Sequence, residues 1–249
     1  MAASRRRVWL FDLDNTLHDA SHAAFGETNA AMNAYMIDHL GVDHDEAARL
    51  RLHYLNRYGA TLLGLVRHHG VRASHFLEET HRHPGMEQRL RTSAHDRAAI
   101  KRLSGAKFIL TNAPRDYTLR VLNTLGLASL FDGVISIEDM TMFGELRPKP
   151  DARMFRHVAA RLKARTTDCV LVEDVLANQR AARSIGMRTA WMRRYLDGRY
   201  RGHLAGGATS GSNNATNTPR TKREVGVHPC PSPQYVCAKM NSLLKLLTL

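Results

Sequence analysis

The sequence is poor in cysteine, in aromatic residues and in long apolar runs. Of its 249 residues only three are cysteines, Cys169, Cys230 and Cys237, and 6% are aromatic. Three cysteines cannot build a disulfide framework, and no pair has the spacing of a zinc site. We therefore expect a reducing compartment, the cytoplasm. No apolar run approaches the roughly 18 to 20 residues of a membrane helix, so no membrane partner is expected.

The first residues lack the apolar stretch of a signal peptide. Arg5, Arg6 and Arg7 give the start a positive charge, but the apolar run that follows, Val8 to Phe11, is interrupted by Asp12. A signal peptide needs about 7 to 15 apolar residues there. We expect no secretion by that route.

Acidic residues are fewer than basic ones. The chain has 36 Lys and Arg against 23 Asp and Glu, a formal charge of +13. Such a charge attracts anions, either a small phosphorylated substrate or nucleic acid. The arginines are scattered, with no aromatic residues interleaved, so we expect no specific nucleic-acid partner.

Short apolar runs alternate with helix-like segments through much of the chain. Strands are expected at 8–11, 107–111, 133–136, 170–173 and 188–192, and helices at 94–103, 114–126, 151–164 and 177–185. Continuous apolar strands are typical of a parallel sheet covered on both faces. The pattern predicts an α/β fold with a doubly wound parallel sheet, a Rossmann-like core.

The segment between the first two strands contains no comparable strand. Helices are expected at 29–40, 45–58, 61–69 and 74–80, with Asp43 and Ser74 as N-caps. So long a segment is too large for a crossover loop. We therefore predict a helical subdomain at 18–92, inserted into a core made of 1–17 and 93–249.

The composition changes again near the end of the chain. Residues 202–232 are rich in Gly, Ser, Asn, Thr and Pro, and such a stretch buries too little apolar area to offset its ordering entropy. It is predicted to be a flexible loop within the core. A short strand at 235–238 and a closing helix at 242–249 are expected after it.

Two carboxylates directly follow the first strand. Asp12 and Asp14 lie where open α/β sheets bind ligands, beyond the carboxyl end of a strand. One could attack as a nucleophile, while the other protonates the leaving group and later deprotonates water. Their mutual repulsion favours a bound cation or a shared proton. A helix N-cap or a solvated turn would also explain the pair taken alone.

Other polar residues follow the second strand and precede a later helix. The Thr111 hydroxyl and the backbone amides near Asn112 can bind phosphate oxygens, although an N-cap is equally consistent with them. Lys149, between two prolines, could neutralise a nucleophilic carboxylate. Arg147 competes for that role, and an exposed loop lysine is the simpler explanation of Lys149 in isolation.

The fourth strand ends in two further carboxylates, Glu173 and Asp174, with Asn178 one helical turn beyond. Hard carboxylate oxygens, with water and substrate phosphate, form the shell that Mg²⁺ prefers. An N-cap for the following helix would again account for these residues alone.

Taken together and in this order, these motifs resemble the haloacid dehalogenase-like (HAD) hydrolase superfamily over roughly residues 7–195. The matching segments are Phe11–Leu17, Ile109–Asn112, Lys149–Pro150, and Val172–Asp174 with Asn178. The inserted helices resemble the helical cap of the first cap class. Softer features, in His18–Leu65 and Tyr58–Leu62, also resemble the pyrimidine 5′-nucleotidase branch.

The resemblance implies roles for the acidic turn and the basic residue. Asp12 would be the nucleophile that forms an aspartyl-phosphate, and Asp14 the general acid and then base. Lys149 would screen the charges of the nucleophile and the phosphate. Asp14 also argues against dehalogenation, because a leaving alkoxide needs a proton and a leaving halide does not.

The resemblance also implies a substrate-binding set and a Mg²⁺ site. Thr111 and the Asn112 backbone would bind the phosphoryl group. Asp12, Asp14 through its carbonyl, Glu173 and Asp174 would bind Mg²⁺, with Asn178 supporting them.

The predicted function is therefore Mg²⁺-dependent hydrolysis of phosphomonoesters, with pyrimidine nucleoside 5′-monophosphates as the expected substrates. His18, Asn56, Tyr58 and Arg67 are the candidates to reach the nucleotide. Sugar phosphates and phosphoglycolate are the alternative substrates. A phospho-acceptor signalling module and a basic nucleic-acid-binding protein are the alternatives from other classes. The sequence leaves the oligomeric state open.

Overall fold

The computed structural model describes residues 7–195 and 238–248 and contains a six-stranded parallel sheet in the order β3-β2-β1-β6-β7-β8. The strands are β1 (Val8–Phe11), β2 (Ala106–Leu110), β3 (Gly133–Ile135), β6 (Cys169–Glu173), β7 (Arg188–Met192) and β8 (Ala238–Met240). The predicted doubly wound α/β core is thereby confirmed. The structure adds a short antiparallel hairpin, β4 (Thr141–Met142) and β5 (Glu145–Leu146), that the sequence pattern did not reveal.

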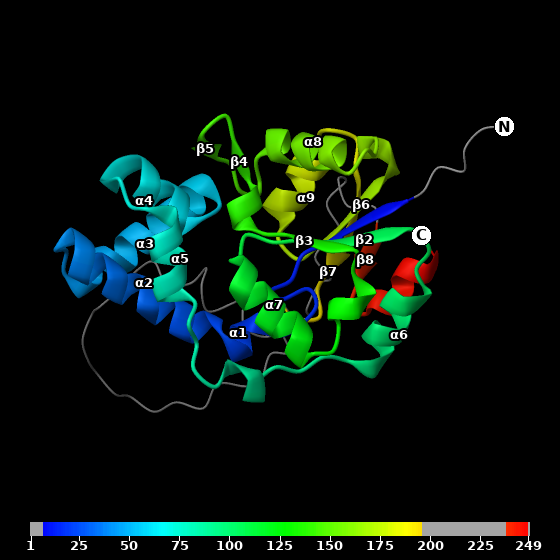
Figure 1. Ribbon diagram of the computed structural model, residues 1–249, viewed down its shortest axis with the longest axis horizontal. Coiled ribbons are helices and arrows are strands. Elements are labelled where there is room, and N and C mark those ends of the chain that lie inside the picture. Colours follow the sequence, from blue (N-terminus) through cyan, green and yellow to red (C-terminus); the bar gives the residue numbers. More distant parts are fainter. Residues whose placement is uncertain (1–6, 196–237, 249) are drawn as a thin grey trace, which may run out of the picture.

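Helices cover both faces of the sheet, α8 (Ala152–Arg161) and α9 (Leu176–Arg183) on one face and α6 (Ala94–Arg102) and α7 (Arg115–Thr124) on the other (Figure 1). Alternate residues of β1 join different apolar clusters: Val8 and Leu10 pack on the α8 and α9 side, and Trp9 and Phe11 on the α6 and α7 side. Because side chains alternate along a strand, a strand covered on both faces is apolar throughout. This explains the uninterrupted apolar run at 8–11.

The insertion after β1 is helical and lies beside the sheet, at the left of Figure 1. Its helices are α1 (Ala20–Ala23), α2 (Phe25–Leu40), α3 (His44–Tyr58), α4 (Thr61–His69) and α5 (Ala73–Thr80). Helices α2 to α5 share an apolar cluster that includes Met36, Leu65 and Phe76 and is joined from the core by Ile137, whereas Ala23 of α1 packs in a core cluster. The chain leaves and re-enters the core at neighbouring points, where the Thr92 hydroxyl donates to the Leu17 carbonyl at 3.4 Å.

One of the two expected N-caps is present and the other is wrong. The Asp43 carboxylate accepts from the Glu46 amide at 2.8 Å and caps α3. Ser74 lies inside α5, which begins at Ala73 after Arg72. The first turn of α5 closes on the Arg72 carbonyl, which accepts from the Phe76 amide at 3.1 Å, so the helix starts before the serine.

The C-terminal residues complete the edge of the sheet. The expected helix at 242–249 is a 3₁₀ helix, η5 (Leu243–Thr248), whose buried residues are Leu243 and Leu246. Residues three apart eclipse in a 3₁₀ helix, so its tighter turn directs both leucines into the core. The predicted loop at 202–232 and residues 235–237 of the predicted strand lie outside the described residues.

The sequence predicts no disulfide framework and no membrane helix. Cys169 is a free, buried cysteine, while Cys230 and Cys237 lie outside the described residues. Among the described helices, none has the length and apolar character needed to cross a membrane.

Candidate active site

The central strand and its two neighbours end at the same edge of the sheet. Phe11 at the end of β1 is paired with Ile109 on β2 and with Val172 on β6. The Asp12 amide donates to the Val172 carbonyl at 2.9 Å, which extends this register one residue past β1. The sheet therefore places Asp12 next to the end of β6, where Glu173 and Asp174 follow.

A buried lysine joins the carboxylates of two strands. Lys149 Nζ donates to Asp12 Oδ1 at 2.6 Å and to Glu173 Oε2 at 2.8 Å. Lys149 is only 1% exposed and Glu173 is completely buried. Arg147 instead pairs with Glu145 and Asp151, so Lys149 is the cation of the two that reaches Asp12.

The charges of this cluster perturb one another strongly. Burial, assisted by the Glu173 carboxylate, raises the pKa of Asp12 to about 7, although Lys149 acts in the opposite direction. Burial and Glu173 also raise the pKa of Asp174 well above its ordinary value. Burial disfavours the charged form of Lys149, but Asp12 and Glu173 outweigh this and raise the pKa of its ammonium.

The same carboxylates are suited to a metal ion. Asp12, Glu173 and Asp174 are all buried and offer oxygen atoms within 4.8 Å of one another. One ammonium cannot balance three neighbouring carboxylates, and repulsion among them adds to burial in raising the pKa of Asp12 and of Asp174. Buried oxygen donors with excess negative charge fit a hard divalent cation such as Mg²⁺.

Thr111 and Asn112 follow β2 at the same edge of the sheet. The Thr111 hydroxyl is buried and accepts from the Ala113 amide at 3.0 Å. The Asn112 side chain donates to the Lys149 carbonyl and accepts from the Lys149 amide, both at 3.0 Å. This two-way contact fixes the backbone that carries the buried ammonium.

Asp14 lies in the turn beyond Asp12. Its Oδ1 is 2.8 Å from the donating Tyr117 hydroxyl and 3.0 Å from His18 Nε2. Sequence reasoning missed Tyr117, because a tyrosine on an amphipathic helix such as α7 has the pattern of a core residue. It also gave no separate role to Thr16, whose hydroxyl donates to Asp12 Oδ2 at 3.2 Å.

The four residues proposed to reach a nucleotide have different environments. His18 is completely buried beside Asp14, which removes it from direct contact with solvent. The Tyr58 hydroxyl is 2.7 Å from His68 Nε2, and the Arg67 guanidinium lies over the Tyr58 ring at 5.2 Å. Asn56 is exposed. The structure does not gather these four residues into one cluster.

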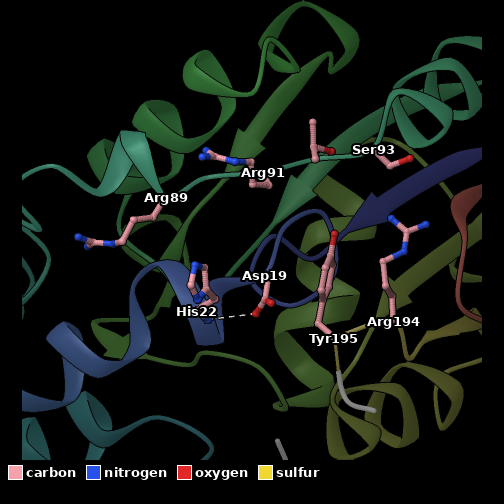
Figure 2. Close-up of a pocket in the computed structure, with 8 residues that line it drawn as sticks. Asp19, His22, Arg89, Arg91, Ser93, Arg194 and Tyr195 are labelled. Carbon is pink, nitrogen blue, oxygen red and sulfur yellow. Dashed lines mark hydrogen bonds between the residues drawn. The ribbon is translucent and has the colours of Figure 1, made fainter. Parts of the chain in front are cut away.

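A cavity of about 420 Å³ lies between the two segments that join the inserted helices to the core and the residues after β7 (Figure 2). Two of its arginines already have acidic partners: Arg89 bonds to Glu27 at 2.6 Å, and Arg194 pairs with Asp96. Its lining does not include the carboxylates at the ends of β1 and β6. The cavity is therefore separate from the candidate active site.

The site and fold agree with a comparison to known families. The family model for haloacid dehalogenase-like hydrolases matches residues 7–186, and the chain belongs to that family. The matched region includes every residue of the candidate site.

Individual proteins resemble the chain more distantly. It is 26% identical over 197 residues to phosphate metabolism protein 8 of Saccharomyces cerevisiae, an alignment covering 73% of this chain and 60% of that protein. The chain thus spans less than two thirds of its relative's length.

Solved structures show the same fold. A HAD phosphatase from Thermococcus onnurineus aligns with a TM-score of 0.56 at 18% identity, covering 97% of this chain and 96% of that one. A 2-haloacid dehalogenase from Pseudomonas syringae pv. Tomato DC3000 aligns with a TM-score of 0.52 at 18% identity, covering 98% and 97%. A phosphatase and a dehalogenase fit the chain about equally well, so its reaction must be argued from its own residues.

Proposed function

We propose that this protein is a Mg²⁺-dependent phosphomonoesterase that forms an aspartyl-phosphate on Asp12. The observation that carries the proposal is the buried contact between Lys149 Nζ and Asp12 Oδ1, at 2.6 Å. A retained ammonium beside a carboxylate restrains the nucleophile and offsets the charge of an approaching phosphoryl group.

Asp12 attacks phosphorus, and the bond from phosphorus to the ester oxygen breaks. The proton that the leaving alkoxide needs comes from Asp14. In the second half, Asp14 takes a proton from the water that attacks the aspartyl-phosphate, which releases phosphate and restores Asp12. General acid–base catalysis of this kind contributes about 10²- to 10⁴-fold to a rate.

The metal would be held by the Asp12, Glu173 and Asp174 side chains, which lie within reach of one ion. We assign it also the Asp14 carbonyl, with Asn178 supporting the shell. When bound, Mg²⁺ supplies positive charge to the phosphoryl oxygens and lessens repulsion among these carboxylates. Thr111 and the Asn112 backbone bind the same phosphoryl group.

The finer proposal concerns the substrate. We assign the inserted helices, within residues 18–92, the role of a cap that contacts the leaving group. Pyrimidine nucleoside 5′-monophosphates are the proposed substrates, on the resemblance of the Tyr58–Leu62 segment. Sugar phosphates and phosphoglycolate are the competing possibilities that a substrate panel must include.

The reaction is tested with Asp12→Asn. We expect hydrolysis of p-nitrophenyl phosphate with Mg²⁺ to fall at least ~10³-fold, because an amide is a poor nucleophile. Asp116→Asn, at an exposed carboxylate of α7, is the control and keeps its activity. Near-normal turnover by folded Asp12→Asn protein would refute the mechanism.

The metal site is tested without relying on turnover. Calorimetric titration with Mg²⁺ is expected to show binding to the unaltered protein and loss of it in Asp174→Asn. A panel of nucleoside monophosphates, sugar phosphates and phosphoglycolate then tests the substrate. A preference for UMP and CMP supports the nucleotidase proposal, and a preference for another class removes it.

A further inference from the structure

We propose that Tyr117 and His18 are positioning residues that fix the general acid Asp14 in its reactive orientation. The inference rests on the function proposed above, since it concerns the same site. Both side chains meet one oxygen of Asp14, Oδ1, the Tyr117 hydroxyl at 2.8 Å and His18 Nε2 at 3.0 Å.

These contacts leave the two oxygens of Asp14 unequal. A carboxylate oxygen has two lone pairs, so two donors fill the capacity of Oδ1. None of the described residues donates a hydrogen bond to Oδ2, and the Asp14 side chain retains 19% exposure. Oδ2 is therefore the oxygen that is left to hold the proton for the leaving group.

The hydrogen of His18 can be placed from its surroundings. Its Nδ1 is buried and has no hydrogen-bond partner, while Nε2 faces Asp14. An N–H buried without an acceptor is among the rarest arrangements in folded proteins. We assign the hydrogen to Nε2, so His18 donates to Asp14 just as Tyr117 does.

Tyr117 is itself held from the side of the inserted helices. The rings of His81 and His83 lie edge-on to it, with centroids 5.8 and 5.7 Å away. His83 Nε2 is 3.0 Å from the Thr28 hydroxyl on α2. The orientation of Asp14 is thereby tied to both the core helix α7 and the insertion.

The chemical role is the same in both half-reactions. When the ester bond breaks, the O–H bond at Oδ2 breaks and a new O–H bond forms on the leaving oxygen. Asp14 becomes a carboxylate whose Oδ1 keeps its two donors. Oδ2 then receives the proton of the attacking water, and the starting state returns.

The test is Tyr117→Phe, which keeps the ring and removes the donor. We measure kcat/KM with Mg²⁺ for p-nitrophenyl, phenyl and ethyl phosphates, whose leaving groups need a proton increasingly. We expect about a 10- to 100-fold loss for ethyl phosphate and less than about 3-fold for p-nitrophenyl phosphate. The inhibition constant of inorganic phosphate should not change, because ground-state binding does not involve Oδ1.

Tyr35→Phe is the matched control. Tyr35 is also buried, and its hydroxyl is 3.0 Å from the Nδ1 of a histidine, His75, but it lies in the inserted helices away from Asp14. We expect no leaving-group dependence from this change. His18→Gln should shift the leaving-group dependence in the same direction as Tyr117→Phe.

A double-mutant cycle with Asp14→Asn completes the experiment. If Tyr117 acts through Asp14, Tyr117→Phe adds no further loss in the Asp14→Asn background with phenyl phosphate. An equal loss on all three esters, or fully additive losses, would overturn the inference. Turnover surviving in Asp12→Asn would instead overturn the proposed function itself, so the two failures are distinguishable.

Discussion

The sheet edge and the inserted helices stabilise their polar groups in different ways. At the edge, Asp12, Glu173 and Lys149 are charged groups buried in direct contact. In the helices, the recurrent polar contact pairs a tyrosine with a histidine: Tyr35 with His75, Tyr54 with His69, and Tyr58 with His68.

The two regions differ in how accurately their polar partners must be positioned. A buried charge is tolerated only where its partner is held at short range, which the register of adjacent strands provides. A tyrosine–histidine hydrogen bond costs less to rearrange than a buried ion pair. The comparison indicates that the polar contacts at the sheet edge tolerate less variation than the tyrosine–histidine contacts among the inserted helices.

The largest expected effect comes from removing the buried cation. Lys149→Met leaves Asp12 and Glu173 facing each other, and should lower the free energy of unfolding by about 3–5 kcal/mol. Denaturant titration in EDTA measures it. Lys107→Met, which removes an ammonium bonded to the carbonyls of Leu103 and Gly105, is the control and should cost much less. Equal losses of unfolding free energy would show that the buried carboxylates do not depend on the Lys149 ammonium.

The junction between the two regions is tested at Gly59. A Cβ there would lie 2.3 Å from Pro150 Cδ and 2.9 Å from the Lys149 carbonyl oxygen, in a backbone with φ +79°. Gly59→Ala should therefore displace the α3–α4 turn from Lys149 and lower kcat/KM about 10-fold, beyond roughly 1–2 kcal/mol of backbone strain.

Gly41→Ala separates the contact from the strain. Gly41 also has a positive φ, +67°, but nothing lies within 4 Å of its added Cβ. Its substitution should destabilise the protein in thermal unfolding and leave kcat/KM unchanged. Loss of activity in both variants would mean that backbone strain, and not the contact between Gly59 and Lys149, lowers kcat/KM.

A pH effect should distinguish the histidine-rich side of the molecule. Burial, with the neighbouring His83, lowers the pKa of His81 from 6.5 to about 4. The folded state thus disfavours the protonated form of His81. The stability that the neutral form allows is fully present above pH 6.5 and is lost as the pH falls toward 4, because the unfolded chain takes up the proton first. The resulting decrease in the free energy of unfolding is about 2 kcal/mol between pH 7 and pH 5.

His81→Gln should reduce this pH dependence of the unfolding free energy by that amount. The same change at the exposed His53 is the control and should leave the dependence as it is. Parallel curves for His81→Gln and the unaltered protein would contradict the assignment.

The smallest expected effect is at a helix end. Asp43→Ala removes the carboxylate that accepts from the Glu46 amide and should cost about 1 kcal/mol in denaturant titration. Ser74→Ala should cost nothing measurable, because Ser74 is inside α5 and does not cap it. A comparable loss at Ser74 would show that its hydroxyl stabilises α5 in another way.

The sequence alone predicted the strands that are marked by a short apolar run in the chain itself. The run Val8–Phe11 is bounded by charge and matches β1, and the run at 188–192 matches β7. Short apolar runs with a polar residue directly after them also predicted which side chains meet at the edge. Lys149 was harder, because 137 residues separate it from Asp12 along the chain. Only the family resemblance joined the two.

What could not be predicted depends on tertiary contacts. Nothing local indicates that Tyr117 reaches back to Asp14 rather than packing as an ordinary core residue. The two-residue strands β4 and β5 are too short for any periodicity. The start of α5 was misplaced because a serine is a good cap in isolation, whereas the buried Phe76 and Leu77 favour an earlier first turn.

The contact between Thr92 and Leu17 brings together the points where the chain departs for the inserted helices and returns from them. A segment with adjoining ends can change its length at little entropic expense to the remainder of the fold. Grafting a foreign helical segment between these two residues should therefore yield chimeras with an intact sheet. Such chimeras would separate what the sheet contributes to the fold from what the inserted helices contribute.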